Sequence, residues 1–536
     1  MDLSDGPHKK PIQPIAHVYK IVSFYVKKIN LKNFKGFQNL ENLEIKPITI
    51  LCGANSCGKT SIIHSLLLQK QTRESRSKNI LFNGKYIHLG DFETVINGTK
   101  KNEQICLSYE YEIAREKVKY SRPRTNDNLS RCVQKLTKSI VNLKANNQFK
   151  KLNLTFEVKL KSSGPKKALL KPADIESYSA RMNLIKSNDE IISGPFVAIK
   201  KENEVSYSLE WRDIAVDDNR QFFPSVKRDG IAPTSSNHKI NDVHVSFDGL
   251  IPMCRFNVNA LMNSNPGDPW AALDFLNAMN EFLSLENREM SYIGPLREEP
   301  SRRYIYENEI IDIGVKGENA AYIYQTEQDN NIKKHYSFDN GFSLVENVKL
   351  STLVTHWLKL MGINSFLSEQ EGELIRLKML SSSCTETQVN IADVGFGVSQ
   401  IFPILLEGLR MKENGSLVLE QPEIHLHPGL QMKMADYFIS LALSGKNVIV
   451  ETHSDHIINR LVRRIVEDEE HSLSDIIAIY FIKNDGEDGT YIEEINISSE
   501  FGITNWPDGF FDQTASEQEL IIRAGINKRK KNRGLN

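Results

Sequence analysis

The octet GANSCGKT at residues 53–60 restricts the fold and the chemistry of this chain more than any other stretch. It fits the pattern Gly-x-x-x-x-Gly-Lys-[Ser/Thr], in which Gly53 and Gly58 permit a tight loop whose backbone N–H groups point at phosphate oxygens. Lys59 adds a positive charge, and the hydroxyl of Thr60 suits Mg²⁺. The octet predicts a phosphate-binding loop, and its predicted nucleotide-binding residues are Asn55, Ser56, Cys57, Gly58, Lys59, Thr60 and Ser61.

The residues on either side of the octet support this prediction. Residues 47–52, PITILC, form a short run rich in β-branched side chains that is typical of a buried strand. Residues 60–70, TSIIHSLLLQK, place Ile62, Ile63 and Leu66 on one face of a helix, with Leu67 beside them. Strand, loop and helix is the order that a phosphate loop requires, so a chance match on a glycine-rich turn is disfavoured. The class expected is α/β.

Composition and charge exclude other classes of protein. A chain of 536 residues is long enough for two or three domains, and a formal net charge of −1 excludes a uniformly basic protein. Neither a secretory leader nor an apolar run of membrane-spanning length is evident, so we expect a cytoplasmic protein without membrane contact. The six cysteines lack Cys-x-x-Cys spacing, which favours reduced thiols. His425 and His427 have no third ligand at a recognisable spacing, which disfavours a metal site there.

Charge is distributed unevenly along the chain. Between Arg115 and Lys171 there are 16 lysine or arginine residues and three acidic ones, an excess of 13 positive charges. A surface of this density is suited to the phosphates of nucleic acid without base specificity, although the same charge could dock an acidic protein. Arg297, Arg302 and Arg303 follow a Gly-Pro turn, where they can contact phosphate or pair with neighbouring glutamates.

Three further elements of a nucleotide site follow in the second half of the chain. The apolar run at residues 417–419 ends at Glu420, the position where an NTPase holds Mg²⁺ or a magnesium-bound water. The run at residues 448–450 ends near His453, which can reach the γ-phosphate. Before both, Gly397 and Ser399 begin an apolar helix whose N–H groups form a second anion site.

These elements, in this order, resemble the ABC-type ATPase heads of the SMC and OLD-like group. In that resemblance DVGFGVSQ (393–400) is the signature motif and ETHS (451–454) carries the switch histidine. Together with YIGPLREEPSRRY (292–304), EQPEIHLHP (420–428) and NWPDGFFDQ (505–513), they resemble the DUF3696-containing AAA-family ATPases. That group includes the PtuA ATPases of Septu and retron-associated antiphage systems.

The resemblance implies a two-lobed head with a mixed sheet and flanking helices, which carries a basic α/β insertion and a helical subdomain. It implies ATP and Mg²⁺ as cofactors, with Thr60 and Glu420 as metal ligands. It also implies a homodimer or higher oligomer, in which Gly397 and Ser399 contact the γ-phosphate bound to the other subunit.

One departure from the family pattern bears on catalysis. The usual acid strand ends in Asp-Glu, whereas this chain reads Glu420-Gln421, and an amide cannot accept a proton from water at neutral pH. Either Glu423, His453 or a group of the partner subunit acts as the base, or hydrolysis is slow. The candidate catalytic residues are therefore Glu420, Gln421, Glu423 and His453.

The expected organisation has six segments. They are a flexible leader (1–23), the first part of the head (24–112), the basic insertion (113–265), a helical or lid subdomain (266–380), the second part of the head (381–513) and a tail (514–536). No nuclease motif is visible, so we expect any nuclease, for example of the HNH type, to be a separate polypeptide. The leading hypothesis is an ATPase that regulates such an effector, with nucleic acid bound at 115–171. The alternatives are a stand-alone DNA-repair or chromosome-maintenance ATPase and a nucleotide-gated scaffold.

Overall fold

The structure is a computed structural model, and the part of the chain that it describes is discontinuous. It comprises residues 26–75, 79–98, 103–114, 131–132, 135–136, 149–163, 172–204, 206–212, 237–255, 269–305, 312–363, 365–381, 384–393, 396–484, 486, 489–507, 509–511 and 513–532. The expected leader (1–23) and most of the basic segment 115–171 lie outside the described residues.

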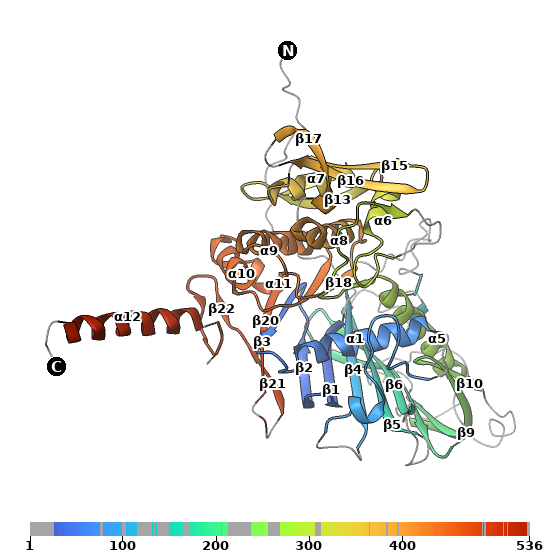
Figure 1. Ribbon diagram of the computed structural model, residues 1–536. Coiled ribbons are helices and arrows are strands. Elements are labelled where there is room, and N and C mark those ends of the chain that lie inside the picture. Colours follow the sequence, from blue (N-terminus) through green and yellow to red (C-terminus); the bar gives the residue numbers. More distant parts are fainter. Residues whose placement is uncertain are drawn as a thin grey trace.

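A six-stranded mixed sheet forms the centre of the molecule (Figure 1). Its order is β11 (Met290–Ile293), β18 (Ser416–Glu420), β19 (Asn447–Glu451), β3 (Ile48–Gly53), β20 (Ile477–Asn484) and β21 (Thr490–Glu494). The first five strands are parallel and β21 pairs antiparallel with β20. The three strands predicted at residues 47–52, 417–419 and 448–450 are confirmed, and they are neighbours in this sheet.

Alternate residues of these strands line two hydrophobic cores. Leu51, Val418 and Ile449 face one core, which contains α1 (Lys59–Glu74). Ile50 and Val450 face the other. The second core is built with α7 (Leu350–Leu360), α8 (Phe396–Arg410), α9 (Pro428–Leu443) and α10 (Asp455–Glu467), of which α8, α9 and α10 lie above the sheet in Figure 1. Because both faces are covered, the central strands are continuously apolar, as parallel strands usually are.

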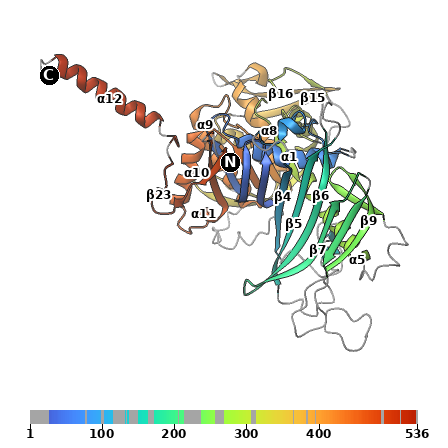
Figure 2. The ribbon, with the colours of Figure 1, turned by 90° about the horizontal axis from the view of Figure 1, so that it is seen from below.

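A nine-stranded antiparallel sheet forms the other lobe, and its long strands lie side by side in Figure 2. Its order is β10 (Ile251–Arg255), β9 (Asn237–Asp248), β8 (Tyr207–Arg212), β7 (Ile191–Lys201), β6 (Ala173–Lys186), β5 (Phe149–Ser162), β4 (Ile105–Ala114), β1 (Val26–Phe34) and β2 (Phe37–Glu44). Helices α1 and α5 (Pro269–Arg288) contribute to its core, where Phe282 of α5 meets the ring of Tyr111 edge-on. The expected insertion 113–265 therefore continues the sheet that β1, β2 and β4 begin, and its described residues are mostly strand.

Several lysines of the basic segment form ion pairs. Lys151 contacts Glu112 on β4, at 2.7 Å, and Lys150 contacts Asp189 at 3.4 Å. Lys159 pairs with Glu157 of its own strand at 3.3 Å. Part of the positive charge that the sequence concentrates here is thus offset by acids on the same sheet.

The segment expected to be helical, 266–380, contains strands as well as helices. Besides α5, α6 (Ala320–Glu327) and α7, it holds β11, β12 (Tyr304–Ile305), β13 (Asn331–Phe338), β14 (Phe342–Lys349), β15 (Phe366–Glu371) and most of β16 (Leu374–Ser381). Strands β12, β16 and β15 form a small sheet to which β17 (Cys384–Asn390) adds, and β13 pairs with β14. The remaining short elements are α2 (Phe92–Val95), η3 (Ile391–Asp393), α11 (Leu473–Ile476), β22 (Ile497–Ser498) and β23 (Gly502–Ile503).

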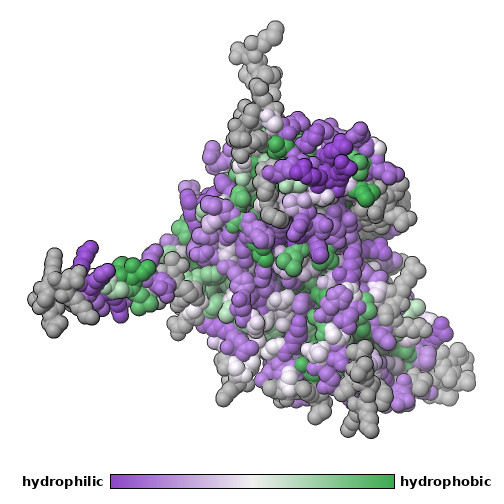
Figure 3. Space-filling view, in the orientation of Figure 1, coloured by the Kyte–Doolittle hydropathy of each residue, from purple (hydrophilic) through white to green (hydrophobic). Residues whose placement is uncertain are grey.

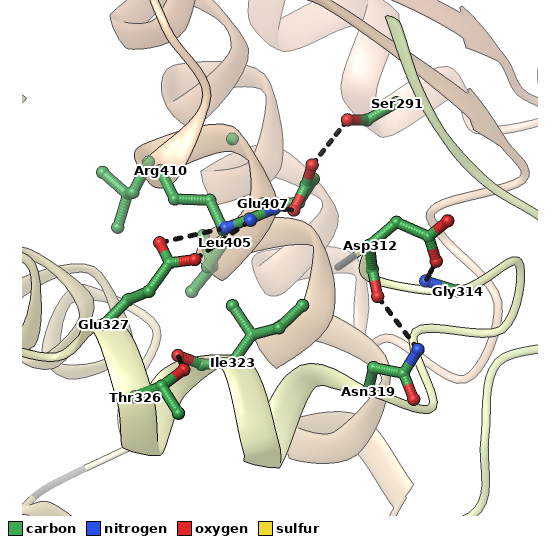
Figure 4. Close-up of polar contacts among 12 residues, drawn as sticks. Ser291, Asp312, Gly314, Asn319, Ile323, Thr326, Glu327, Leu405, Glu407 and Arg410 are labelled. Carbon is green, nitrogen blue, oxygen red and sulfur yellow. Dashed lines mark hydrogen bonds and ion pairs between the residues drawn. The ribbon is translucent and has the colours of Figure 1, made fainter. Parts of the chain in front are cut away.

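An ionic cluster fixes the C-terminal end of α8 (Figure 4). Arg410 contacts Glu407 at 2.6 Å and Glu327 of α6 at 3.1 Å. Glu407 also accepts a hydrogen bond from the hydroxyl of Ser291 on β11. The helix that begins at the predicted signature motif is therefore tied to α6 and to the edge strand of the central sheet.

The tail forms helix α12 (Gln513–Asn532), which projects from the body of the molecule (Figure 1). Figure 3 shows an apolar band on it, made by the exposed side chains of Leu520, Ile521, Ile522 and Ile526. Among the described residues, no helix has both the length and the apolar composition that crossing a membrane requires.

Candidate nucleotide-binding site

The loop between β3 and α1 has the backbone conformation that its glycines allow. Gly53 has φ +143° and Gly58 has φ +105°, both in the region that side chains disfavour. A Cβ atom on Gly53 would lie 2.2 Å from the carbonyl oxygen of Ile482. On the other side, the hydroxyl of Thr490 donates to the carbonyl oxygen of Cys57 at 2.9 Å and so fixes the loop against β21.

The predicted nucleotide-binding residues occupy this loop and the first turn of α1. Asn55 and Ser56 are exposed at its tip, whereas Cys57 and Ser61 are buried. The ammonium of Lys59 folds back over the loop and donates to the carbonyl oxygens of residues 53 and 54, at 3.1 and 2.6 Å. A backbone concavity with a lysine over it is the arrangement that holds phosphates in P-loop proteins.

Two acidic side chains lie at the carboxyl ends of the neighbouring strands. Glu420 ends β18 and Glu451 ends β19, and the two residues are paired in register. The hydroxyl of Thr60 donates to Oε1 of Glu451 at 3.0 Å, and the hydroxyl of Tyr292 on β11 donates to Oε1 of Glu420 at 3.0 Å. The parallel pairing of these strands therefore brings the phosphate loop, both acids and the edge strand β11 together.

Burial dominates the electrostatics of this acid pair. Burial, followed by the charge of Glu451, raises the pKa of Glu420 to about 7, against the opposing effects of Tyr292 and Lys35. Burial also raises the pKa of Glu451, while the hydrogen bond from Thr60 opposes the shift. Both carboxylates are thus costly to ionise in a protein without a bound cation.

A lysine from the first hairpin also reaches this region. Lys35 lies in the turn between β1 and β2 with φ +51°, and its ammonium is 2.8 Å from Nδ1 of His64 on α1. Burial, followed by the charge of Lys35, lowers the pKa of His64 to about 3, so its ring is neutral and accepts the hydrogen bond. The pKa of Lys35 is itself lowered by burial and raised by Glu420. A cation from the other lobe thus acts on Glu420.

The structure gives Glu423 two hydrogen bonds. Its carboxylate accepts from the hydroxyl of Thr452 at 2.8 Å and from the backbone N–H of His453 at 2.7 Å. Glu423 therefore holds the turn that follows β19. Burial, followed by the charge of Lys59, lowers the pKa of His453 and favours its neutral form.

Gln421 has a constrained backbone. Its φ is +45°, its N–H donates to the carbonyl oxygen of Glu451 at 2.7 Å, and its own carbonyl oxygen accepts from Arg297 at 2.7 Å. Arg297 is buried, and the burial lowers its pKa to about 10, against the opposing charge of Glu423. The arginine thus contacts the acid-strand turn and not the glutamates beside it in sequence, while Arg302 pairs with Asp393.

Gly397 and Ser399 lie in the first turn of α8. Ser399 lines a pocket with Glu298, Glu318 and Phe402, and no phosphate-loop residue is among the described residues around it. The site residues thus fall into two groups, one at the strand ends and one at α8. His427 is the N-cap of α9, where Nδ1 accepts from the N–H of Gly429 at 3.1 Å. No group of three metal-ligating side chains occurs in the described ranges.

The residues present fit a magnesium nucleotide. Glu451 is 3% exposed, and its Oε2 has no hydrogen-bond partner among the described residues. Carboxylate and hydroxyl oxygens are the ligands that Mg²⁺ prefers, and a buried carboxylate oxygen without a partner is unfavourable unless a cation or donor joins it.

Comparison with known protein families agrees with this geometry. The model described as AAA ATPase domain matches residues 25–458, which is most of the chain. The chain belongs to the AAA ATPase domain family. A second model, described as a protein of unknown function (DUF3696), matches residues 474–520.

The solved structures that are similar to this AAA ATPase share little sequence identity with it. An SMC head bound to the C-winged helix domain of ScpA is 10% identical with a TM-score of 0.36, over 88% of this chain and 98% of that chain. The SMC head domain from Thermotoga maritima is 10% identical with a TM-score of 0.33, over 88% and 99%. A Pyrococcus furiosus SMC head with an extended coiled coil, bound to the C-terminal domain of ScpA, has the same identity and TM-score over 93% and 99%. No curated protein matches the chain.

Four residues at the site of this ATPase were not assigned to it from sequence, namely Lys35, Tyr292, Arg297 and Glu451. Only Glu451 could have been assigned to the site from the sequence. It ends an apolar run, as Glu420 does, and the carboxyl ends of parallel strands meet at one edge of the sheet. The sequence around Tyr292 gives no such indication, because the pairing of β11 with β18 depends on long-range packing.

Lys59→Ala is expected to weaken ATP binding about 100-fold or more, which is about 2.7 kcal/mol, because it removes the positive charge over the phosphate loop. Isothermal titration calorimetry measures the affinity, and Lys334→Ala, an exposed lysine on β13, is the matched control. Wild-type affinity in Lys59→Ala would contradict the assignment of the loop.

Glu420→Gln is expected to stabilise the nucleotide-free protein in EDTA more at pH 8 than at pH 5.5. The raised pKa of about 7 means that the folded state holds the proton more tightly than the unfolded state, so the cost of ionisation grows as pH rises from 4.5 and is complete above 7. The difference between the two gains is about 2 kcal/mol, measured from urea midpoints. Glu470→Gln, an exposed glutamate, is the control, and equal gains at both pH values would refute the assignment.

Proposed function

We propose that this AAA ATPase is an ABC-type enzyme that closes as a homodimer around ATP and Mg²⁺ and regulates a partner effector. The observation that carries the proposal is the separation of the two predicted groups of site residues. The strand-end group of Lys59, Thr60, Glu420 and Glu451 shares one edge of the sheet, while Ser399 lines a separate pocket. A second subunit would bring its Ser399 to the γ-phosphate that Lys59 binds.

The phosphate loop and the strand ends support the chemical part of the proposal. Thr60 and the strand-end acids would hold Mg²⁺, which would neutralise charge on the β- and γ-phosphates. His453 follows β19, its backbone N–H donates to Glu423, and its side chain would contact the γ-phosphate. Gln421, held by Arg297, would orient water without accepting its proton.

Slow turnover follows from Gln421 if no other group replaces it. Both oxygens of Glu423, the nearest alternative in sequence, already accept hydrogen bonds. ATP would then act mainly as a clamp that keeps the dimer closed. The same observation favours a second candidate function, a nucleotide-gated scaffold with negligible hydrolysis.

The effector we propose is a nuclease encoded separately, of the HNH type, in an antiphage system of the PtuA kind. Support comes from the sequence motifs shared with that group and from the DUF3696 match. A neighbouring gene for such a nuclease or for a reverse transcriptase would favour this role. Its absence would favour a stand-alone ATPase that acts on DNA.

Gln421→Glu is expected to raise phosphate release by about 100-fold and to shorten the lifetime of the ATP-dependent dimer, because it supplies a general base. Phosphate release and analytical ultracentrifugation with ATP and Mg²⁺ measure the two effects. Gln421→Asn is the matched control, since asparagine tolerates positive φ and supplies no base. Fast wild-type turnover that Gln421→Glu leaves unchanged would show that another residue is the base, and a monomer with bound ATP would refute the clamp.

Nucleic-acid binding by segment 115–171 is expected to weaken steeply with salt. Lys166, Lys167 and Lys171 lie within it, and reversing their charge to glutamate should reduce the slope of log affinity against log salt by roughly 0.9 for each phosphate that the segment no longer neutralises. Fluorescence anisotropy with labelled DNA and RNA measures the slope. The control is Lys333→Glu with Lys334→Glu, on exposed positions of β13. An unchanged slope in the triple variant would move the nucleic-acid site elsewhere.

A further inference from the structure

Glu451 differs from the other acids of the site in what its carboxylate contacts. One oxygen accepts the hydroxyl hydrogen of Thr60 at 3.0 Å, and the other has no hydrogen-bond partner among the described residues although the side chain is only 3% exposed. Both oxygens of Glu423 accept hydrogen bonds, from residues 452 and 453, whereas Glu420 accepts one bond from Tyr292, and only Glu451 of the three has a buried oxygen without a partner among the described residues.

The position of Glu451 in the sheet brings it close to the phosphate loop. The order β18, β19, β3 places Glu451 on the strand next to the one that leads into the loop, in register with Leu51. Glu420 lies one strand further away. Because Thr60 is the first-turn residue whose hydroxyl suits Mg²⁺, the acid that contacts Thr60 is the one best placed to share its cation.

Lys59, whose charge acts on Glu451, does not hydrogen-bond its second carboxylate oxygen. The ammonium of Lys59 donates to the carbonyl oxygens of Gly53 and Ala54. A buried carboxylate oxygen without a donor is unfavourable, so such a group in a native protein calls for a bound ion, a water or another donor. Hydroxyl and carboxylate oxygens together form the hard donor set of a divalent cation.

We propose that Glu451, together with Thr60, binds the divalent cation of the nucleotide site, directly or through a cation-bound water. In this assignment the strand next to the phosphate loop carries the main acidic ligand, and Glu420, held by Tyr292, contributes less to metal affinity. The inference rests on the proposed function, because the cation accompanies the bound nucleotide.

The test separates nucleotide affinity from metal affinity in the full-length protein. A fluorescent ATP analogue is titrated in EDTA, and Mn²⁺ binding to the protein–nucleotide complex is then measured by electron paramagnetic resonance, with protein in excess. Glu451→Gln is expected to keep metal-free nucleotide affinity within about twofold and to weaken Mn²⁺ binding by about 10–100-fold. Glu420→Gln should weaken Mn²⁺ binding less, and Glu470→Gln should leave it unchanged.

Each outcome bears on the assignment. Wild-type Mn²⁺ affinity in Glu451→Gln, or a larger loss in Glu420→Gln, overturns the inference while the proposed function stands. Wild-type protein that binds no nucleotide, either in EDTA or with Mg²⁺, refutes the proposed function and the inference with it. Glutamine can still accept from Thr60, so the fold should persist. Should Glu451→Gln fail to fold by circular dichroism, Glu451→Asp keeps the charge but shortens the side chain, and unchanged Mn²⁺ affinity in that variant likewise overturns the inference.

Discussion

The parallel pairing of β18, β19 and β3 is the constraint on which the site depends. It brings Thr60 into contact with Glu451, although 391 positions separate them in the chain. All five residues of β19 are buried, and Val450 faces one core while Ile449 faces the other. A slip of one residue in this strand would exchange its two faces and move Glu451 away from the loop. The two hydrophobic cores therefore fix the register of β19, and this register holds Glu451 beside Thr60.

The sequence predicted the parts of the site that local patterns specify. The phosphate loop, the strands that end at Glu420 and before His453, and the helix that starts at the signature motif are all found where the patterns indicated. The glycines at 53 and 58 explain why, since their positive φ values are local requirements of the loop.

The unpredicted parts depend on long-range pairing. Alternation within β5 and β6 does not reveal that these strands extend the sheet begun by β1 and β4, because the partners of an antiparallel strand leave no mark on its own pattern. The contact of Arg297 with the carbonyl oxygen of Gln421 could not be predicted for the same reason, since the two residues are 124 positions apart. The described part of the tail is helical as far as Asn532, which its charge run at 527–533 did not indicate.

Two buried carboxylates lie at adjacent strand ends, and their ionisation is unfavourable when no ligand is bound. Tyr292 and Lys35 oppose the raised pKa of Glu420, and Thr60 opposes that of Glu451, but burial outweighs them in both cases. Groups shifted in this way concentrate at functional sites, because the ligand supplies the missing compensation. The Thr60 and Tyr292 hydroxyls fix where each carboxylate points and so preserve the arrangement before a ligand arrives.

Strand β11 connects the two groups of site residues within one chain. Successive residues of a strand point to opposite faces, so Ser291 reaches Glu407 at the end of α8 while Tyr292 reaches Glu420. Arg410 holds Glu407 from the other side and joins it to α6. Helix α8, whose first turn contains Gly397 and Ser399, is thus fixed at its last turn to the strand that positions Glu420. Glu451 instead accepts its hydrogen bond from Thr60 of α1. Two different elements, β11 and α1, therefore position two acids that are paired in register on β18 and β19.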